Sequence, residues 1–171
     1  MADRPTPYLR AVTPEDLVAL RAVFGDPEVM RYSDSGVRDD AMVAEWIARH
    51  SAMYPAGLGK RAICVAGVEG PIGYTGLVRD LDRHRPDELE IGYRLARAWW
   101  GRGIITTANR LAIAAPDRPD AARIVAIIDP GNAGSIAAAR KLGMTYRREA
   151  MFPGYDHPDH VYGVDLPLPP A

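Results

Sequence analysis

Hydrophobic and polar positions alternate along this chain with two different periods, which separate strand-like from helix-like segments. Short runs rich in β-branched and aromatic residues predict seven strands, at residues 8–12, 61–68, 72–78, 88–95, 121–128, 144–151 and 160–166. Helical spacing predicts four helices, at residues 14–24, 39–53 and 104–115, and from the turn at Asn132 to Leu142. The order strand, helix, strand between Glu88 and Ile128 requires a parallel right-handed crossover within an otherwise antiparallel sheet. The sequence therefore predicts a mixed α/β (α+β) fold.

A glycine turn, Trp100-Gly101-Arg102-Gly103, joins the strand at 88–95 to the helix that starts near Ile104. The first backbone N–H groups of a helix have no intrahelical partner and carry the positive end of the helix dipole, so this turn predicts an anion site. Arg102 adds a full positive charge. Glycine accounts for 16 of 171 residues, and Gly57-Leu58-Gly59 repeats the same spacing, so the turn is informative only in its context.

The composition of the chain excludes several classes of protein. At 171 residues, 47% apolar and 25% charged, the chain fits one globular domain over residues 1–171. A net charge of −1 argues against a nucleic-acid surface. No run approaches the roughly 20 apolar residues of a membrane span, and Met1 to Pro7 has no signal-peptide core, so we expect a cytoplasmic protein away from the membrane. The single cysteine, Cys64, rules out an internal disulfide, and we expect it and Trp46 in the core.

Four motifs together resemble the GNAT acetyltransferases, and are most similar to the branch that contains the ribosomal-protein N-terminal acetyltransferases. They are Glu90-Ile91-Gly92-Tyr93-Arg94-Leu95, Trp100-Gly101-Arg102-Gly103-Ile104, Asn132-x-x-Ser135 and Lys141-Leu142-Gly143-Met144. The resemblance covers nearly the whole chain, including Thr13 to Leu17 and Asp26 to Met30. It implies a mostly antiparallel sheet of about six to seven strands, flanked by about four helices and splayed at the motif strand. It also implies acetyl-CoA as donor and an amine as acceptor.

The resemblance implies a path for coenzyme A along the motif strand and the glycine turn. Backbone groups of Leu95, Ala96 and Arg97 would meet the pantetheine amides. The pyrophosphate would bind N–H groups of the turn and helix start, at Gly101, Arg102, Gly103, Ile104 and Ile105. Asn132 would reach the pantetheine arm, although its place before a helix also predicts an N-cap. Ile105 departs from the family's usual glycine or alanine, and its side chain either crowds the pyrophosphate or points into the core.

The same resemblance assigns catalytic roles. Ser135 would protonate the departing CoA thiolate, since Ala138 and Ala139 stand where many relatives carry a tyrosine. Glu90 would take the proton of the amine, directly or through water. Glu88, two residues earlier on the same face, is expected to be a solvated strand carboxylate. Transfer would be direct in a ternary complex, with a backbone N–H near Leu95 stabilising the oxyanion.

The acceptor stays open among a peptide N-terminus, an amino acid, a polyamine and an antibiotic amine. Tyr155 and the loop at Met30 to Tyr32 are candidates to line its pocket. No metal is expected, because the cluster Asp156, His157, Asp159 and His160 lacks a defined ligand set. His84 is expected to be solvated.

Two other functions remain open. A non-catalytic acyl-CoA sensor would have the same fold, and a dinucleotide-binding protein is disfavoured because no G-x-G-x-x-G follows the first strand. A homodimer is also open.

Overall fold

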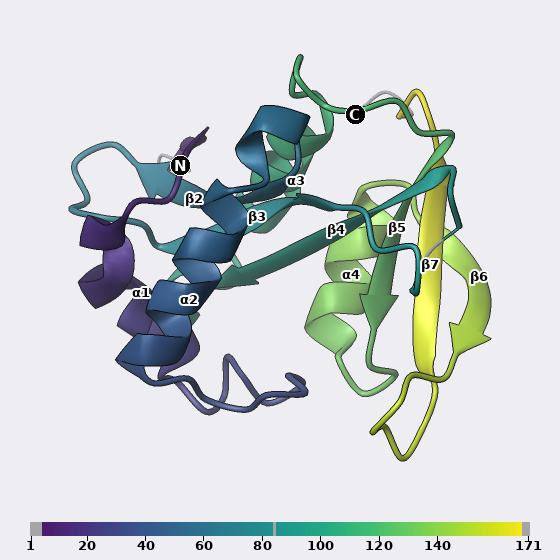
Figure 1. The fold of residues 1–171 in the computed structure, drawn as a ribbon, viewed down its shortest axis with the longest axis horizontal. Helices are drawn as coiled ribbons and strands as arrows, with labels where there is room; N and C mark the ends of the chain where they lie inside the picture. Colours follow the sequence, from purple (N-terminus) through teal and green to yellow (C-terminus); the bar gives the residue numbers. More distant parts are fainter. Residues whose placement is uncertain (1–4, 84, 169–171) are drawn as a thin grey trace.

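A computed structural model describes residues 5–83 and 85–168, which form a seven-stranded mixed sheet with helices on both faces (Figure 1). The strands are β1 (Pro7–Arg10), β2 (Gly59–Val65), β3 (Gly73–Val78), β4 (Glu88–Leu95), β5 (Arg123–Ile128), β6 (Thr145–Ala150) and β7 (Asp159–Asp165). Their order in the sheet is β1-β2-β3-β4-β5-β7-β6, and β4 and β5 are the one parallel pair in it. The predicted fold class and crossover are confirmed.

Four α-helices lie close to their predicted ranges. They are α1 (Leu17–Phe24), α2 (Asp40–Ser51), α3 (Ile104–Ile113) and α4 (Ala133–Lys141). The first turn of the helix predicted at residue 14 is the 3-10 turn η1 (Pro14–Asp16). Two further 3-10 turns, η2 (Tyr54–Ala56) and η3 (Arg97–Trp99), were not predicted, because a single turn has too few residues to show a period.

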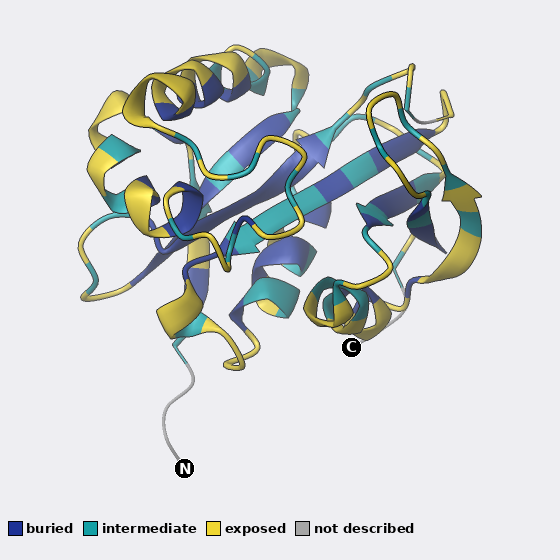
Figure 2. Cartoon of the chain, turned by 90° about the horizontal axis from the view of Figure 1, so that it is seen from below, coloured by how far each residue is buried: buried dark blue, intermediate teal, exposed yellow. Residues whose placement is uncertain are grey.

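The sheet lies between two helical layers. Helices α1 and α2 pack on one face through a cluster that includes Phe24, Trp46 and Tyr74, so Trp46 is a core residue as predicted. Helices α3 and α4 cover the other face, where Ile113 and Leu142 pack against the sheet. Figure 2 shows the strands largely buried between the layers and the outward faces of the helices exposed.

Strands β4 and β5 separate soon after they meet. Their pairing covers Glu88 to Glu90 on β4, whereas β4 continues to Leu95 alongside β3 alone (Figure 1). The Ala96 N–H donates to the carbonyl of Ile72, its cross-strand partner. Hydrogen-bonded and non-bonded pairs alternate in antiparallel strands, so the backbone groups of Tyr93 and Leu95 point away from β3. They face the gap between β4 and β5, which is the predicted splay.

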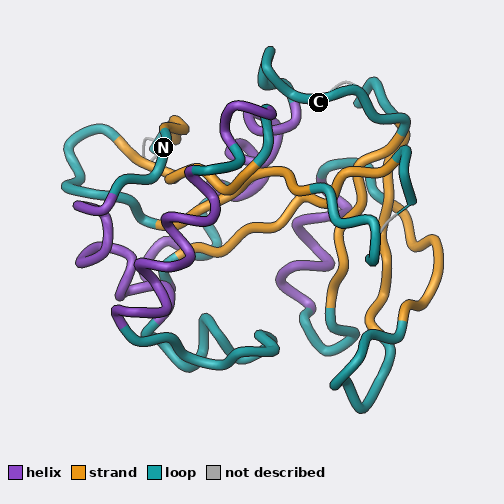
Figure 3. The backbone as a smooth tube through the Cα atoms, in the orientation of Figure 1, coloured by secondary structure: helices purple, strands orange, loops and turns teal. Residues whose placement is uncertain are grey.

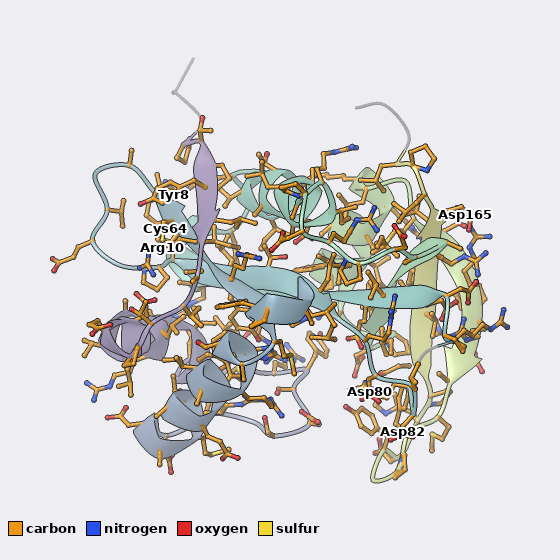
Figure 4. The ribbon with its side chains drawn as sticks, turned by 45° about the horizontal axis from the view of Figure 1, so that its top comes forward. Tyr8, Arg10, Cys64, Asp80, Asp82 and Asp165 are labelled. Carbon is orange, nitrogen blue, oxygen red and sulfur yellow. The ribbon has the colours of Figure 1, made fainter. Side chains whose placement is uncertain are left out.

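Cys64 lies on β2 opposite Tyr8 of β1 and is buried, as predicted. Figure 4 places it beside Tyr8 and Arg10, far from Asp80 and Asp82 on the β3–β4 loop. Burial raises the pKa of its thiol. The expectations for His84 and for residues 1–4 lie outside the described residues. Within residues 5–83 and 85–168, no helix combines the length and apolar character that a membrane span requires.

Candidate active site

A cavity of about 750 Å³ opens where β4 and β5 separate. Its walls are β4, the glycine turn before α3, the first turns of α4 and the loop between α1 and α2. It brings together most of the predicted site residues, namely Glu90, Leu95, Gly101, Gly103, Ile104, Ile105, Asn132 and Ser135. Ala96, Arg97 and Arg102 do not line it.

The glycine turn has the backbone that an anion site needs. Gly101 and Gly103 have φ angles of 75° and 78°, in the left-handed region that favours glycine. A Cβ at either position would meet no atom within 4 Å, so the requirement for glycine is conformational. Gly103 is the N-cap of α3, which leaves the N–H groups of Ile104, Ile105 and Thr106 without helical partners at the cavity wall.

The guanidinium of Arg102 turns away from the cavity. Its Nη2 donates to the Ala98 carbonyl at 3.1 Å, and the group lies 5.0 Å from the centre of the Trp99 ring. The half-buried side chain of Ile105 packs with the cluster that contains Ile63 and Ile104, and it also borders the cavity. The alternative in which Ile105 packs into the core is therefore supported, and crowding of the pyrophosphate stays a prediction.

Of the three residues expected to offer free backbone groups to pantetheine, Leu95 is the best placed through its N–H, which faces the splay, whereas its carbonyl accepts from the Trp100 indole at 2.7 Å. The Ala96 N–H donates to Ile72, and its carbonyl accepts from the Trp99 N–H at 2.9 Å. Ala96 therefore lacks the free groups expected of it, because η3 and the sheet use both. The Arg97 carbonyl accepts from the Trp100 N–H at 3.1 Å, so it is used by the turn as well.

Asn132 and Ser135 form the start of α4. The Asn132 Oδ1 accepts a hydrogen bond from the Ser135 N–H at 3.0 Å, so the predicted N-cap is confirmed. The Tyr93 hydroxyl donates to the Ser135 carbonyl, also at 3.0 Å. Burial raises the pKa of Tyr93, which keeps the hydroxyl a neutral donor. No pattern in the sequence predicted this contact, apart from the alternation that puts Tyr93 on the same face as Leu95.

The opposite face of β4 carries Glu90, Gly92 and Arg94 toward the α1–α2 loop. Figure 3 shows this loop as a long teal segment that reaches toward the turn between β5 and α4. There the Tyr32 hydroxyl donates to the Gly131 carbonyl at 2.9 Å. Tyr32 and Tyr155 line the cavity, whereas Met30, in the same predicted loop, is a core residue at 1% exposure.

Lys60 is a cavity residue that the sequence reading missed. Its side chain is buried at 8% exposure, and its Nζ donates to the Gly76 carbonyl at 3.0 Å. Burial lowers the pKa of Lys60 to about 8, and the nearby Glu90 carboxylate opposes this shift. The feature of the sequence that could have indicated Lys60 is a lysine at the start of the apolar strand that follows Gly59.

Glu88 is fully buried, so the expectation that it is solvated is wrong. Strands β6 and β5 bring Arg148 and Arg123 to its carboxylate, with Arg148 Nη2 at 3.1 Å, and the Arg85 N–H also donates to it. Burial opposes ionisation, but the hydrogen bonds from Arg148 and Arg85 outweigh it and lower the pKa of Glu88. Glu88 is therefore a structural ion-pair residue outside the cavity lining.

The predicted acidic and histidine cluster is joined by Asp129, from the end of β5. His157 Nε2 lies 3.0 Å from Asp129, and its Nδ1 lies 2.6 Å from Asp156. The carboxylates of Asp156 and Asp129 accept hydrogen bonds from the protonated ring, and this raises the pKa of His157. Burial raises the pKa of Asp159. Ligand atoms of Asp129, His157 and Asp159 lie within 4.8 Å of one another, and both His157 nitrogens are engaged by carboxylates.

Comparisons with known proteins agree with this geometry. The family model of the acetyltransferase (GNAT) domain matches residues 8–145. YkkB of Bacillus subtilis (strain 168) is 32% identical over 145 residues, which cover 82% of each chain. The aminoglycoside acetyltransferase AAC(6')-Ib, solved with paromomycin and acetyl-CoA, superposes with a TM-score of 0.74 at 19% identity over 94% of both chains. A Salmonella typhimurium acetyltransferase that modifies the N-terminal serine of ribosomal protein L7/L12 also gives 0.74, at 19% identity over 94% of this chain and 95% of that one.

Proposed function

Since the chain belongs to the GNAT acetyltransferase family, we propose that it transfers an acetyl group from acetyl-CoA to an amine by direct attack in a ternary complex. One observation carries the proposal. A single cavity joins the splay beside Leu95, the unpaired N–H groups at the start of α3, and the side chains of Glu90 and Ser135. It therefore combines a thioester-binding strand, an anion site, a proton acceptor and a proton donor.

Acetyl-CoA would bind along the wall formed by β4 and α3. The Leu95 N–H faces the splay and would meet the pantetheine arm. The pyrophosphate would be held by N–H groups from Gly101 to Ile105, at the positive end of the α3 dipole. The Asn132 Oδ1 is used by the N-cap, so the Nδ2 donors of this side chain are the groups that would reach the pantetheine arm.

Acetyl transfer requires three proton or charge changes that these residues would serve. Glu90 would accept a proton from the acceptor ammonium, and the free amine would then attack the thioester carbonyl. A backbone N–H near Leu95, that of Tyr93, which also faces the splay, would stabilise the oxyanion of the tetrahedral intermediate. As the C–N bond forms and the C–S bond breaks, Ser135 would protonate the departing thiolate, and the proton that the attacking nitrogen then loses would return through water to the Ser135 hydroxyl. Every change is a proton transfer or an acyl transfer, so we propose that the reaction requires no metal.

Two acceptor classes follow from the structural neighbours. AAC(6')-Ib was solved with an aminoglycoside, and the Salmonella enzyme modifies a protein N-terminus. We propose an α-amine or small-molecule amine for this chain. An α-amino group, with a pKa of about 7.7–8.0, needs less help to lose its proton than a lysine at about 10.4, which favours the α-amine for a single carboxylate base.

CoA release, measured with acetyl-CoA and a panel of amines, tests the proposal. The panel holds short peptides with free N-termini, paromomycin, polyamines and free amino acids, and mass spectrometry identifies the acetylated product. Binding of acetyl-CoA is measured separately by calorimetry. Turnover with any member supports the proposed enzyme. Binding without turnover on any acceptor favours the acyl-CoA sensor, and no binding overturns both functions.

A further inference from the structure

Three residues form a row across three neighbouring strands beneath the part of the cavity that contains Glu90 and faces the α1–α2 loop. We call this part the acceptor side. Lys60 on β2 is the register partner of Gly76 on β3, and Gly76 is the register partner of Gly92 on β4. The Lys60 side chain crosses β3 along this row. Its Nζ donates to the Gly76 carbonyl and ends beside Gly92.

The glycines make room for this crossing. A Cβ built on Gly92 would lie 2.5 Å from Lys60 Nζ and 3.2 Å from Lys60 Cε. No other atom is recorded within 4 Å of that Cβ, so the space above Gly92 is taken by the end of the lysine. A Cβ on Gly76 would meet the Gly59 carbonyl oxygen at 2.1 Å, so Gly76 is needed for the close approach of β2. The row thus carries a buried ammonium from β2 to the middle of β4.

The ammonium ends beside Gly92, two residues along β4 from the proposed base. Glu90 and Gly92 are two residues apart on β4, so their side-chain positions share one face, and both line the cavity with Lys60. Glu90 is half-buried and shares the cavity with the carboxylates of Asp129 and Asp159. Burial and like charges both favour the protonated form of a carboxyl group, whereas a nearby cation favours the ionised form.

We propose that Lys60 is a positioning residue of the acceptor side, whose ammonium holds Glu90 in the carboxylate form. The inference rests on the proposed function only for what that carboxylate does, which is to accept the proton of the amine. Other charged and titratable groups also face this pair, and their charges add to its balance. Those near Lys60 are Arg94, Arg83, Arg49 and His50, and those near Glu90 include Asp159 and Tyr155.

The test reads the protonation of Glu90 directly. Full-length protein with ¹³C-carboxyl-labelled glutamate is titrated by NMR, and the Glu90 signal is assigned by its loss in Glu90→Gln. Lys60→Met removes the charge and keeps an unbranched apolar side chain. We expect the Glu90 midpoint to rise by about 1 pH unit in this variant, the lower end of the effect of a nearby opposite charge.

A second variant keeps the charge and moves it. Gly92→Ala introduces a methyl group that only the flexible end of Lys60 opposes, so the strand accepts it and the ammonium shifts. We expect the Glu90 midpoint to rise in the same direction by a smaller amount. Arg140→Met is the control, because Arg140 is an exposed cation on α4 outside the cavity lining, and the Glu90 midpoint should not move in it.

An unchanged midpoint in Lys60→Met overturns the inference. If circular dichroism shows that this variant does not fold, Gly92→Ala decides, and an unchanged midpoint there overturns it. The acid limb of kcat/KM is measured on the same variants. If the acid limb of kcat/KM shifts together with the NMR midpoint, the result supports both the effect of Lys60 on Glu90 and the role of Glu90 as base. If the NMR midpoint shifts while the acid limb of kcat/KM does not, the result supports the effect of Lys60 on Glu90 but excludes Glu90 as the base.

Discussion

The Tyr93 hydroxyl donates a hydrogen bond to the Ser135 carbonyl at 3.0 Å, and this bond joins β4 to the first turn of α4. The two elements lie on opposite sides of the splay, since β4 and β5 pair only as far as Glu90. The bond therefore fixes the separation between the wall that carries Leu95 and the wall that carries Ser135. Both walls are needed if one thioester is to meet the oxyanion donor and the proton donor together.

Tyr93→Phe should therefore loosen the cavity without removing a reacting group. We expect kcat/KM for acetyl-CoA to fall by about fivefold, since one net hydrogen bond contributes roughly 1 kcal/mol. Steady-state kinetics at saturating acceptor measure this. Tyr146→Phe is the control, because Tyr146 lies on β6 with 50% exposure and outside the cavity lining. Equal kinetics for the two variants would show that the Tyr93 bond does not shape the site.

Glu90→Gln removes the proposed base and nearly keeps its shape. We expect kcat to fall on the order of 100-fold, a typical contribution of a general base. The remaining rate should rise more steeply with pH, because the variant depends on acceptor that has already lost its proton. The affinity for acetyl-CoA, measured by calorimetry, should not change. Glu45→Gln, at an exposed position on α2, is the matched control, and a Glu90→Gln profile that matches it would exclude Glu90 as base.

Ser135→Ala distinguishes the proposed role of the Ser135 hydroxyl in proton transfer from its contribution to the stability of α4. The Asn132 cap uses the Ser135 N–H, and Tyr93 uses the Ser135 carbonyl, so the substitution removes neither bond. We expect kcat to fall about tenfold or more while the midpoint of thermal unfolding stays constant. Asn132→Ala, by contrast, should lower the stability by about 1 kcal/mol through loss of the cap. An unchanged kcat in Ser135→Ala would leave the thiolate to be protonated by water.

Lys60→Met should change stability in a pH-dependent way. Burial lowers the pKa of Lys60 from 10.5 to about 8, so between these values the unfolded chain holds a proton that the folded protein has lost. Wild-type stability therefore rises with pH across this window, and the burial cost is greatest below it. We expect Lys60→Met to be more stable below pH 8, by up to about 3 kcal/mol.

Urea unfolding of both proteins, below pH 8 and near pH 10.5, measures this difference. The advantage of Lys60→Met should shrink as the pH rises. Lys141→Met, at an exposed position, should show no such trend. A gain of Lys60→Met that is constant with pH would mean that the lysine is not buried as a charge.

Ile105→Ala tests the residue that departs from the family pattern. Its side chain packs with Ile63 and Ile104, so we expect a loss of about 1–2 kcal/mol in stability, less than for a fully buried isoleucine. Affinity for acetyl-CoA should stay within about twofold. Leu111→Ala, an exposed residue on the same helix at 44% exposure, should cost little. Tighter acetyl-CoA binding in Ile105→Ala would show instead that the isoleucine crowds the pyrophosphate.

Local features of the chain were predicted well from its sequence. The alternation in Glu88–Leu95, the glycine turn, the start of α3 and the Asn132 cap each depend on a few consecutive residues. The hydrophobic period and the residue types in turns predict such features directly, because the backbone atoms that interact lie within one turn or one strand. The motifs built on them were sufficient to predict the family.

Other features depend on contacts between residues far apart in the chain, and no local pattern predicted them. The insertion of β7 between β5 and β6 is one such feature, and the burial of Glu88 against Arg123 and Arg148 is another. The position of the Lys60 ammonium beside Gly92 depends on strand register, and the hydrogen bond from Tyr93 to Ser135 depends on the splay. Periodicity tells which face of a strand a side chain occupies, but not which strand lies beside it. The helices, the strands and the glycine turn thus follow from local sequence, whereas the pairing of the strands determines which charges meet at the site.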